Sequence, residues 1–104
     1  MIAFSFKDIH AHFDQFNRMG QECRPEEIAE NQCFGGASRI KTVLDHFRSK
    51  SKNVLLLDAG DQFQGTMFFN TFGGYLSAQI MNEFRYDAMT IGNHGMFRQS
   101  NLIA

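Results

Sequence analysis

The fold class of this chain can be inferred from the stretch Asn53–Thr66, which reads NVLLLDAGDQFQGT. Its first part, Val54–Leu57, is a continuous aliphatic run of strand length, typical of a parallel sheet that is covered on both faces. Its second part, Gly60–Gly65, is a polar turn in which Asp61 stands between glycine-rich turns where the backbone allows a close approach. A buried strand that ends in such a turn predicts an α/β fold with polar groups at one edge of the sheet.

Two other apolar runs are predicted to be strands of the same sheet. Ile2–Phe6 is a short run that ends at a charged pair, Lys7 and Asp8. Ala88–Ile91 is a third run, and Gly92 ends it. Each strand is therefore followed directly by polar residues.

Two helices are predicted between the strands. The first is opened by Gly35–Gly36, and its apolar positions recur with helical spacing at Ile40, Val43, Leu44 and Phe47. The second runs from about Gly74 to Phe84. The segment Ala11–Phe34 is irregular and polar and is predicted to be a long loop.

The predicted order is therefore β-α-β-α-β. Crossover connections of this length imply parallel strands with right-handed connections. In open α/β sheets the ligand site lies beyond the carboxyl ends of the strands. All three strands should deliver their polar residues to that edge.

Composition excludes several classes of function. The chain has 104 residues, which suits one small domain or a piece of a larger one. Its formal net charge of -1 does not indicate the excess positive charge that is typical of nucleic-acid-binding domains. No apolar run approaches the roughly 20 residues that span a bilayer, and Met1–Phe6 is too short for the apolar region of a signal peptide. We expect no nucleic-acid partner, no transmembrane segment and no signal peptide in this sequence.

Two cysteines, Cys23 and Cys33, lie near the only proline, Pro25. They could be a reduced pair or a local disulfide, which would stabilise the fold by about 3 kcal/mol in the chain-entropy model. Their spacing does not fit a zinc knuckle. Composition alone leaves both redox states open.

Metal-ligand residue types follow each of the three predicted strands. A two-metal hydrolase needs carboxylates and imidazoles around two cations, with one carboxylate bridging both. Asp8 and His10 would hold the first cation, Asp61 would bridge, and Asn93 would offer a neutral oxygen to the second cation. His94 would then be free to stabilise or protonate the phosphoryl transfer, because protonating a leaving oxygen needs a type of side chain that changes charge near neutral pH.

Each of these residues also has an ordinary structural interpretation. Asp8 and Asp61 could cap turns or helices, Gly92–Asn93 makes a good tight turn, and His10 could be a loop histidine. Taken singly, the two interpretations are equally good. Three such segments on three strand ends together favour the metal site.

The motifs resemble a known family. The stretches Asn53–Thr66, Arg85–His94 (RYDAMTIGNH) and Gly35–Arg39 (GGASR) are similar to the amino-terminal metallophosphoesterase domain of the 5′-nucleotidases, which include the ecto-5′-nucleotidases and salivary apyrases. The resemblance implies a partial calcineurin-like sandwich in which residues 1–104 are the amino-terminal part. On this resemblance we expect residues 1–104 not to include the carboxyl-terminal nucleotide-binding domain of the family.

The resemblance also implies an activity and residue roles. The family hydrolyses phosphate esters of nucleotides with two divalent ions, zinc or manganese and magnesium, outside the cell or at its surface. By match to its motifs, Asp8 and His10 resemble ligands of the first metal, Asp61 the bridging ligand and Asn93 a ligand of the second, while His94 resembles the catalytic histidine. The sequence assigns no substrate-binding residue.

A disulfide between Cys23 and Cys33 is implied in the same way, since the pair matches a local bridge of the secreted members of the family.

Two departures from the family affect the expected activity. Phe97 stands where the family has the aspartate that pairs with the catalytic histidine, and the later metal-binding histidines have no counterpart. We therefore expect weak metal binding and negligible activity from this chain alone. The alternative function is that of a non-catalytic truncated or degenerate relative that acts by binding a partner.

Overall fold

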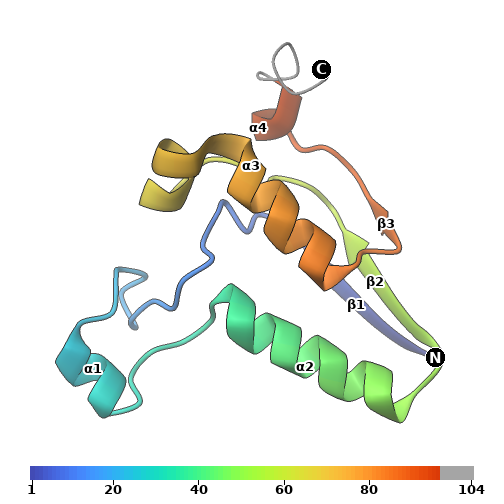
Figure 1. Cartoon of the computed structure of the whole chain (residues 1–104), viewed down its shortest axis with the longest axis horizontal. Helices are drawn as coiled ribbons and strands as arrows, with labels where there is room; N and C mark the ends of the chain where they lie inside the picture. Colours follow the sequence, from blue (N-terminus) through green and yellow to red (C-terminus); the bar gives the residue numbers. More distant parts are fainter. Residues whose placement is uncertain (97–104) are drawn as a thin grey trace.

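The computed structural model describes residues 1–96, which form a three-stranded sheet with helices packed beside it (Figure 1). The strands are β1 (Ile2–Phe6), β2 (Val54–Asp58) and β3 (Ala88–Met89), in the order β1-β2-β3. Both strand pairs are parallel, and Ile2 lies opposite Val54. The predicted α/β fold with a parallel sheet is confirmed.

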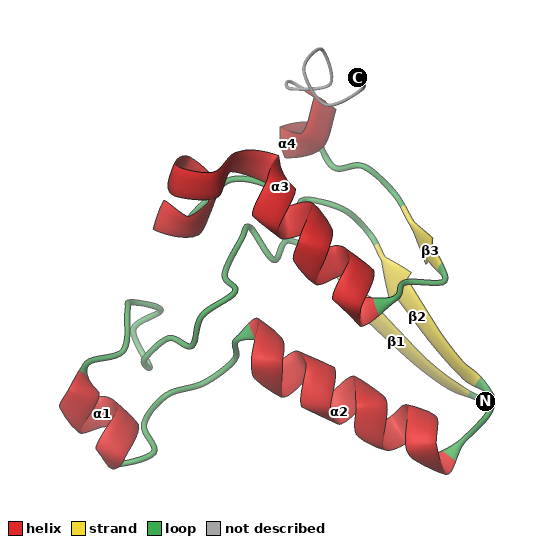
Figure 2. Cartoon of the chain, viewed as in Figure 1, coloured by secondary structure: helices red, strands yellow, loops and turns green. Residues whose placement is uncertain are grey.

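Four helices accompany the strands in the described part of the chain: α1 (Pro25–Ala29), α2 (Ala37–Lys50), α3 (Met67–Phe84) and α4 (Asn93–Met96). Figure 2 shows α2 and α3 next to the sheet, while α1 lies apart from them. Helix α2 begins directly after Gly35–Gly36, as predicted. None of these helices is both long and apolar enough to cross a membrane.

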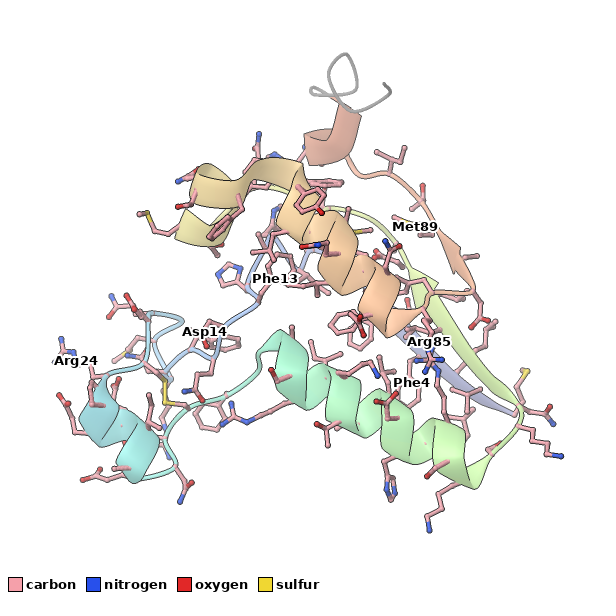
Figure 3. The ribbon with its side chains drawn as sticks, in the orientation of Figure 1. Phe4, Phe13, Asp14, Arg24, Arg85 and Met89 are labelled. Atoms are coloured by element: carbon pink, nitrogen blue, oxygen red, sulfur yellow. A yellow bond between two sulfur atoms is a disulfide. The ribbon has the colours of Figure 1, made fainter. Side chains whose placement is uncertain are left out.

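The apolar core lies in two clusters. One consists of Leu44 on α2, Leu56 on β2 and Phe84 on α3, with Phe4 and other partly buried side chains packed against it. Phe4 reaches from β1 toward α2, where its ring centroid is 5.1 Å from that of Phe47 (Figure 3). This cluster attaches both long helices to the sheet.

The second cluster lies nearer the carboxyl ends of the strands. It consists of Ala11, Phe13 and Phe69, with Ile9 and Phe63 packed against it. Its members come from the loop after β1, the loop after β2 and the start of α3. It therefore anchors the two loops that leave the sheet at that edge.

Two element boundaries differ from the prediction. Helix α3 is broken at Gly73, whose φ of 61° and ψ of -153° are not helical. The helix predicted from about Gly74 to Phe84 is its second part, and the first part, residues 67–72, was not predicted. Strand β3 covers Ala88–Met89 rather than Ala88–Ile91. Since β2 ends at Asp58, a last bond from Thr90 N–H to the Asp58 carbonyl, 2.9 Å, closes the pairing.

The predicted long loop Ala11–Phe34 contains more structure than expected. Helix α1 starts with Pro25, and the Arg24 N–H donates to the Glu27 carboxylate at 2.8 Å, which is an N-terminal capping interaction. The Asn17 amide also donates to Glu27, at 3.1 Å. These local side-chain bonds stabilise a short helix that apolar periodicity does not indicate.

A disulfide joins Cys23 and Cys33 and closes the loop around α1 (Figure 3). This is the pairing that the family resemblance implies. It resolves the choice that composition left open in favour of the oxidised state.

Candidate metal centre

The loops that follow β1 and β2 run side by side beyond the carboxyl edge of the sheet. Backbone hydrogen bonds continue between them, from Asp8 N–H to the Gly60 carbonyl and from His10 N–H to the Asp61 carbonyl, both 3.0 Å. A third bond joins Ala11 N–H to the Gln62 carbonyl, again at 3.0 Å. The backbone itself thus sets where the polar side chains emerge.

The same two loops hold most of the left-handed backbone of the molecule. Of the seven non-glycine residues with positive φ in the described chain, five lie here: Asp8, His10, Ala11, Asp61 and Gln64, with φ between 49° and 63°. Such conformations cost roughly 1–3 kcal/mol each and persist only where the surrounding structure imposes them. They turn successive side chains in directions that a regular strand could not.

Glycines let the loops approach each other at backbone distance. A Cβ built on Gly60, where φ is +97°, would lie 2.6 Å from the nitrogen of Gly92. A Cβ on Gly65 would lie 2.7 Å from the His10 carbonyl oxygen. Neither position could hold a side chain without moving a neighbouring backbone, so the three strand-end segments are fixed relative to one another.

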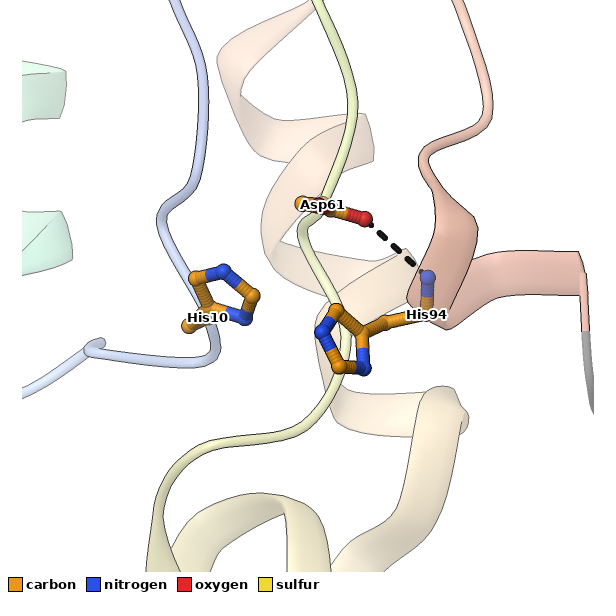
Figure 4. Close-up of side chains that lie close together, drawn as sticks. All are labelled: His10, Asp61 and His94. Atoms are coloured by element: carbon orange, nitrogen blue, oxygen red, sulfur yellow. Dashed lines mark hydrogen bonds between the residues drawn. The ribbon is translucent and has the colours of Figure 1, made fainter.

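This geometry gathers His10, Asp61 and His94, which come from the ends of β1, β2 and β3 (Figure 4). One potential ligand atom from each side chain lies within 4.8 Å of the others, and all three residues are half-buried. The ring centroids of His10 and His94 are 5.1 Å apart with an edge-to-face angle of 78°. Two imidazoles and a carboxylate are ligands that zinc and similar divalent cations accept.

Hydrogen bonds orient the first imidazole for such a role. The Nδ1 of His10 lies 3.3 Å from the carbonyl oxygen of Phe63. Because a carbonyl only accepts, a hydrogen bond here is made by the Nδ1–H form of the ring, in which a neutral imidazole has its lone pair on Nε2. Partners of this kind fix the ring orientation of most metal-binding histidines.

Asp61 combines a structural bond with a possible ligand role. Its Oδ1 accepts the backbone N–H of His94 at 3.1 Å, at the start of α4. The ordinary interpretation places Asp61 as a cap of the turn after its own strand, whereas this bond reaches a residue 33 positions further along the chain. It is compatible with metal binding, because a carboxylate has further lone pairs on both oxygens.

Asp8, another predicted ligand, lies beside this three-residue group and not within it. Asp8 lies at its rim, with Oδ1 3.8 Å from Nε2 of His10 and Oδ2 3.7 Å from the ammonium of Lys7. Asn93 is exposed at the start of α4. Phe97, the replacement for the family aspartate, lies outside the described residues.

Sequence reasoning did not single out Gln64, whose side-chain oxygen lies 2.7 Å from Nδ1 of His94. A neutral amide inside a turn carries no ligand signature, and only the fold reveals its contact with His94. No signal in the sequence alone would have found it.

Asp58 is a second residue that the sequence reasoning missed. It is buried at the end of β2, and its Oδ1 accepts the N–H of Gly60 at 2.7 Å, which holds the turn that leads to Asp61. Burial raises the pKa of the nearby Tyr86 hydroxyl, and the negative charge of Asp58 raises it further. A charged residue at the end of an aliphatic strand was the available signal.

Comparison with known proteins gives consistent matches. The family model for the calcineurin-like phosphoesterases matches residues 8–103. The snake venom 5′-nucleotidase of Naja atra is 45% identical over 87 residues, which are 84% of this chain and 16% of that protein. The 5′-nucleotidase of Homo sapiens is 41% identical over 87 residues, 84% of this chain and 14% of that protein.

Solved structures agree with these matches. The 5′-nucleotidase precursor from Thermus thermophilus superposes with a TM-score of 0.68 at 34% identity, covering 88% of this chain and 17% of that one. The NAD nucleotidase of Haemophilus influenzae gives a TM-score of 0.69 at 32% identity, covering 88% and 16%. The chain thus spans about a sixth of the length of the proteins it matches.

Proposed function

The chain belongs to the calcineurin-like phosphoesterase family, and we propose that it carries the amino-terminal half of a two-metal site that hydrolyses phosphate esters of nucleotides. The observation that carries the proposal is the group formed by His10, Asp61 and His94 beyond the carboxyl edge of the sheet. It joins residues that are more than thirty positions apart in the sequence at the place where α/β proteins bind their ligands.

The residues at this edge of the sheet would bind the metal ions. His10 and Asp61 would hold the first cation, with Asp8 at the rim, while Asp61 and Asn93 would serve the second. Bound divalent cations supply charge stabilisation at the phosphoryl oxygens. Nitrogen and carboxylate donors favour zinc or manganese over a pure magnesium site.

His94 would supply the proton for the reaction. Hydrolysis breaks the bond between phosphorus and the ester oxygen, forms a bond from phosphorus to a water oxygen, and requires a proton on the leaving oxygen. A half-buried imidazole at the site is suited to deliver that proton and to recover one from the attacking water.

Different observations support the proposed class of substrate and the proposed cellular compartment. Relatives named 5′-nucleotidase and NAD nucleotidase support a nucleotide substrate. The disulfide between Cys23 and Cys33 supports an oxidising compartment, outside the cell or at its surface.

The alternative is a non-catalytic relative that binds a partner. Two observations favour it for the 104-residue chain taken alone. The four residues proposed as ligands are too few to surround two cations, and Phe97 takes the place of the aspartate that pairs with the catalytic histidine. We expect this chain alone to release phosphate from AMP or ATP no faster than its His94→Ala variant.

A chimera tests the proposal directly. This chain would replace the matching segment of the Naja atra 5′-nucleotidase, and phosphate release from AMP would be measured with added zinc or manganese. We expect metal-dependent turnover that His94→Ala lowers roughly 10²- to 10⁴-fold, the usual range for loss of general acid catalysis. Asp61→Asn should also lower the turnover, and its matched control Asp14→Asn, at an exposed loop carboxylate, should leave the rate unchanged. A folded, metal-binding chimera without turnover would refute the proposal and leave the non-catalytic alternative.

A further inference from the structure

Gln64 makes a short side-chain contact at the edge of the sheet that the proposed metal site does not explain. It lies in the loop between Asp61 and α3, and its Oε1 is 2.7 Å from Nδ1 of His94. Both side chains are half-buried. A contact this short between a side-chain carbonyl and a ring nitrogen is a hydrogen bond.

The backbone around Gln64 is held in place on both sides. Gln64 itself is in the left-handed region with φ 63°, and the next residue, Gly65, packs against the backbone of His10. Thr66 donates its hydroxyl proton to the carbonyl of Ala11 at 2.7 Å. Gln64 is therefore presented to His94 by an anchored loop.

The chemistry of this contact determines which nitrogen of His94 faces the site. An amide oxygen only accepts, so the hydrogen of the bond must come from Nδ1 of the ring. We propose that Gln64 is a positioning residue that accepts the Nδ1–H of His94, so that Nε2 of the neutral ring is the nitrogen that takes up and later delivers the reacting proton. The inference rests on the proposed function, because it specifies how the proposed proton donor is oriented.

Gln64 and Phe63 would then perform the same task for two different rings. The carbonyl of Phe63 holds the proton on Nδ1 of His10, and Gln64 does so for His94. Consecutive residues of one loop would thus set both imidazoles with Nε2 free. A neutral acceptor orients the ring without adding a negative charge next to the cation site.

The remaining histidines supply internal references. The Nδ1 of His12 lies 3.0 Å from the Ile9 carbonyl, which also requires the Nδ1–H form. The ring of His46 is exposed, and no hydrogen bond to it is found among residues 1–96. His46 should therefore show the Nε2–H form that an unconstrained histidine side chain prefers in water.

Nitrogen NMR of the metal-free chain tests the tautomer without any assay of activity. Long-range ¹H–¹⁵N correlation spectra would be recorded about two pH units above the usual histidine pKa of roughly 6.5, where the rings are neutral. We expect Nδ1 of His94 to be protonated in the wild type. Gln64→Leu should convert His94 to the Nε2–H form, and Gln64→Glu, which keeps an acceptor, should restore the Nδ1–H form.

Two controls separate positioning from a general effect on the fold. Gln79→Leu makes the same chemical change on the exposed face of α3, where Gln79 bonds only to Tyr75 among the described residues, and should leave His94 unchanged. His10 should remain in the Nδ1–H form in every variant. If Gln64→Leu disturbs His10, Gln64→Met, which keeps the side-chain length, takes its place.

Two results would overturn the inference. One is a wild-type His94 in the Nε2–H form, which would mean that the Gln64 amide donates rather than accepts. The other is an unchanged Nδ1–H form of His94 after Gln64→Leu or Gln64→Met. Failure of the proposed function would appear elsewhere, as an inactive chimera with the His94 tautomer as expected.

Discussion

The apolar cluster under α2 and the polar edge beyond the strands are built on opposite principles. Leu44, Leu56 and Phe84 meet through regular helices and strands, and their contacts are nondirectional. At the edge, residues with left-handed backbone and close backbone contacts at Gly60 and Gly65 fix the direction of each polar side chain. The first region should therefore set the stability of the chain, and the second should set ligand geometry at some expense in stability.

Removing a buried side chain from the apolar cluster should give the largest change in stability. Leu56 is 0% exposed in the middle of β2, so Leu56→Ala leaves a cavity. We expect the free energy of unfolding to fall by about 2–5 kcal/mol. Urea denaturation followed by circular dichroism measures this, with the half-buried neighbour Leu55→Ala as the control. Equal losses at both positions would contradict a core centred on Leu56.

Adding one methyl group at the edge should affect ligand geometry more than stability. A Cβ on Gly92 would lie 1.9 Å from Oδ1 of Asp61, so Gly92→Ala must displace that carboxylate. We expect about 1–3 kcal/mol less stability and at least a roughly tenfold weaker affinity for zinc, measured by denaturation and calorimetry.

Gly20→Ala is the matched control for that change. Gly20 also has a positive φ, of +73°, but no atom lies within 4 Å of the position that a Cβ would take there. The variant should therefore lose some stability through backbone strain and keep its zinc affinity. A similar loss of zinc affinity in Gly92→Ala and Gly20→Ala would contradict the idea that the polar edge, and not general stability, sets the ligand geometry.

Tyr86 lies at the border of the two regions. Its replacement should have the smallest effect on the free energy of unfolding, and only at high pH. Its pKa is raised above the ordinary value of 10, first by burial and then by the charge of Asp58. The unfolded chain ionises near pH 10, so the stabilisation is present below that pH and is lost as pH rises through the higher pKa of the folded state.

Tyr86→Phe should abolish that alkaline loss, which amounts to at most about 1.4 kcal/mol per pH unit above pH 10. Urea midpoints between pH 9 and 11 would show the difference, with the exposed Tyr75→Phe as the control. A wild type as stable at pH 11 as at pH 9 would contradict the assigned environment of Tyr86.

The parts of the fold that sequence predicted are those with continuous apolar runs. Val54–Leu57 and Ile2–Phe6 became β2 and β1, and α2 began after its glycine pair, because burial of these runs dominates the local preferences. The predicted start at about Gly74 matches the second part of α3, after the non-helical Gly73, whereas the first part, which places Phe69 in the core, was missed.

The candidate site was predictable in its residue types and location but not in its detail. Strand ends followed by ligand-type residues indicated the correct edge. The directions of Asp8 and His10 depend on left-handed backbone that no sequence pattern encodes. The contact between Gln64 and His94 depends on the approach of two loops that are 30 residues apart in the chain, which only tertiary structure supplies.

The central claim is that the edge of the sheet where His10, Asp61 and His94 meet binds a divalent cation. Calorimetric titration of the 104-residue chain with zinc tests it most directly, comparing the wild type with Asp61→Asn, which keeps an oxygen for the His94 N–H but loses the charge. We predict weak binding of one ion by the wild type, reduced at least roughly tenfold in Asp61→Asn and unchanged in Asp14→Asn. Equal zinc affinity in all three proteins would contradict the account.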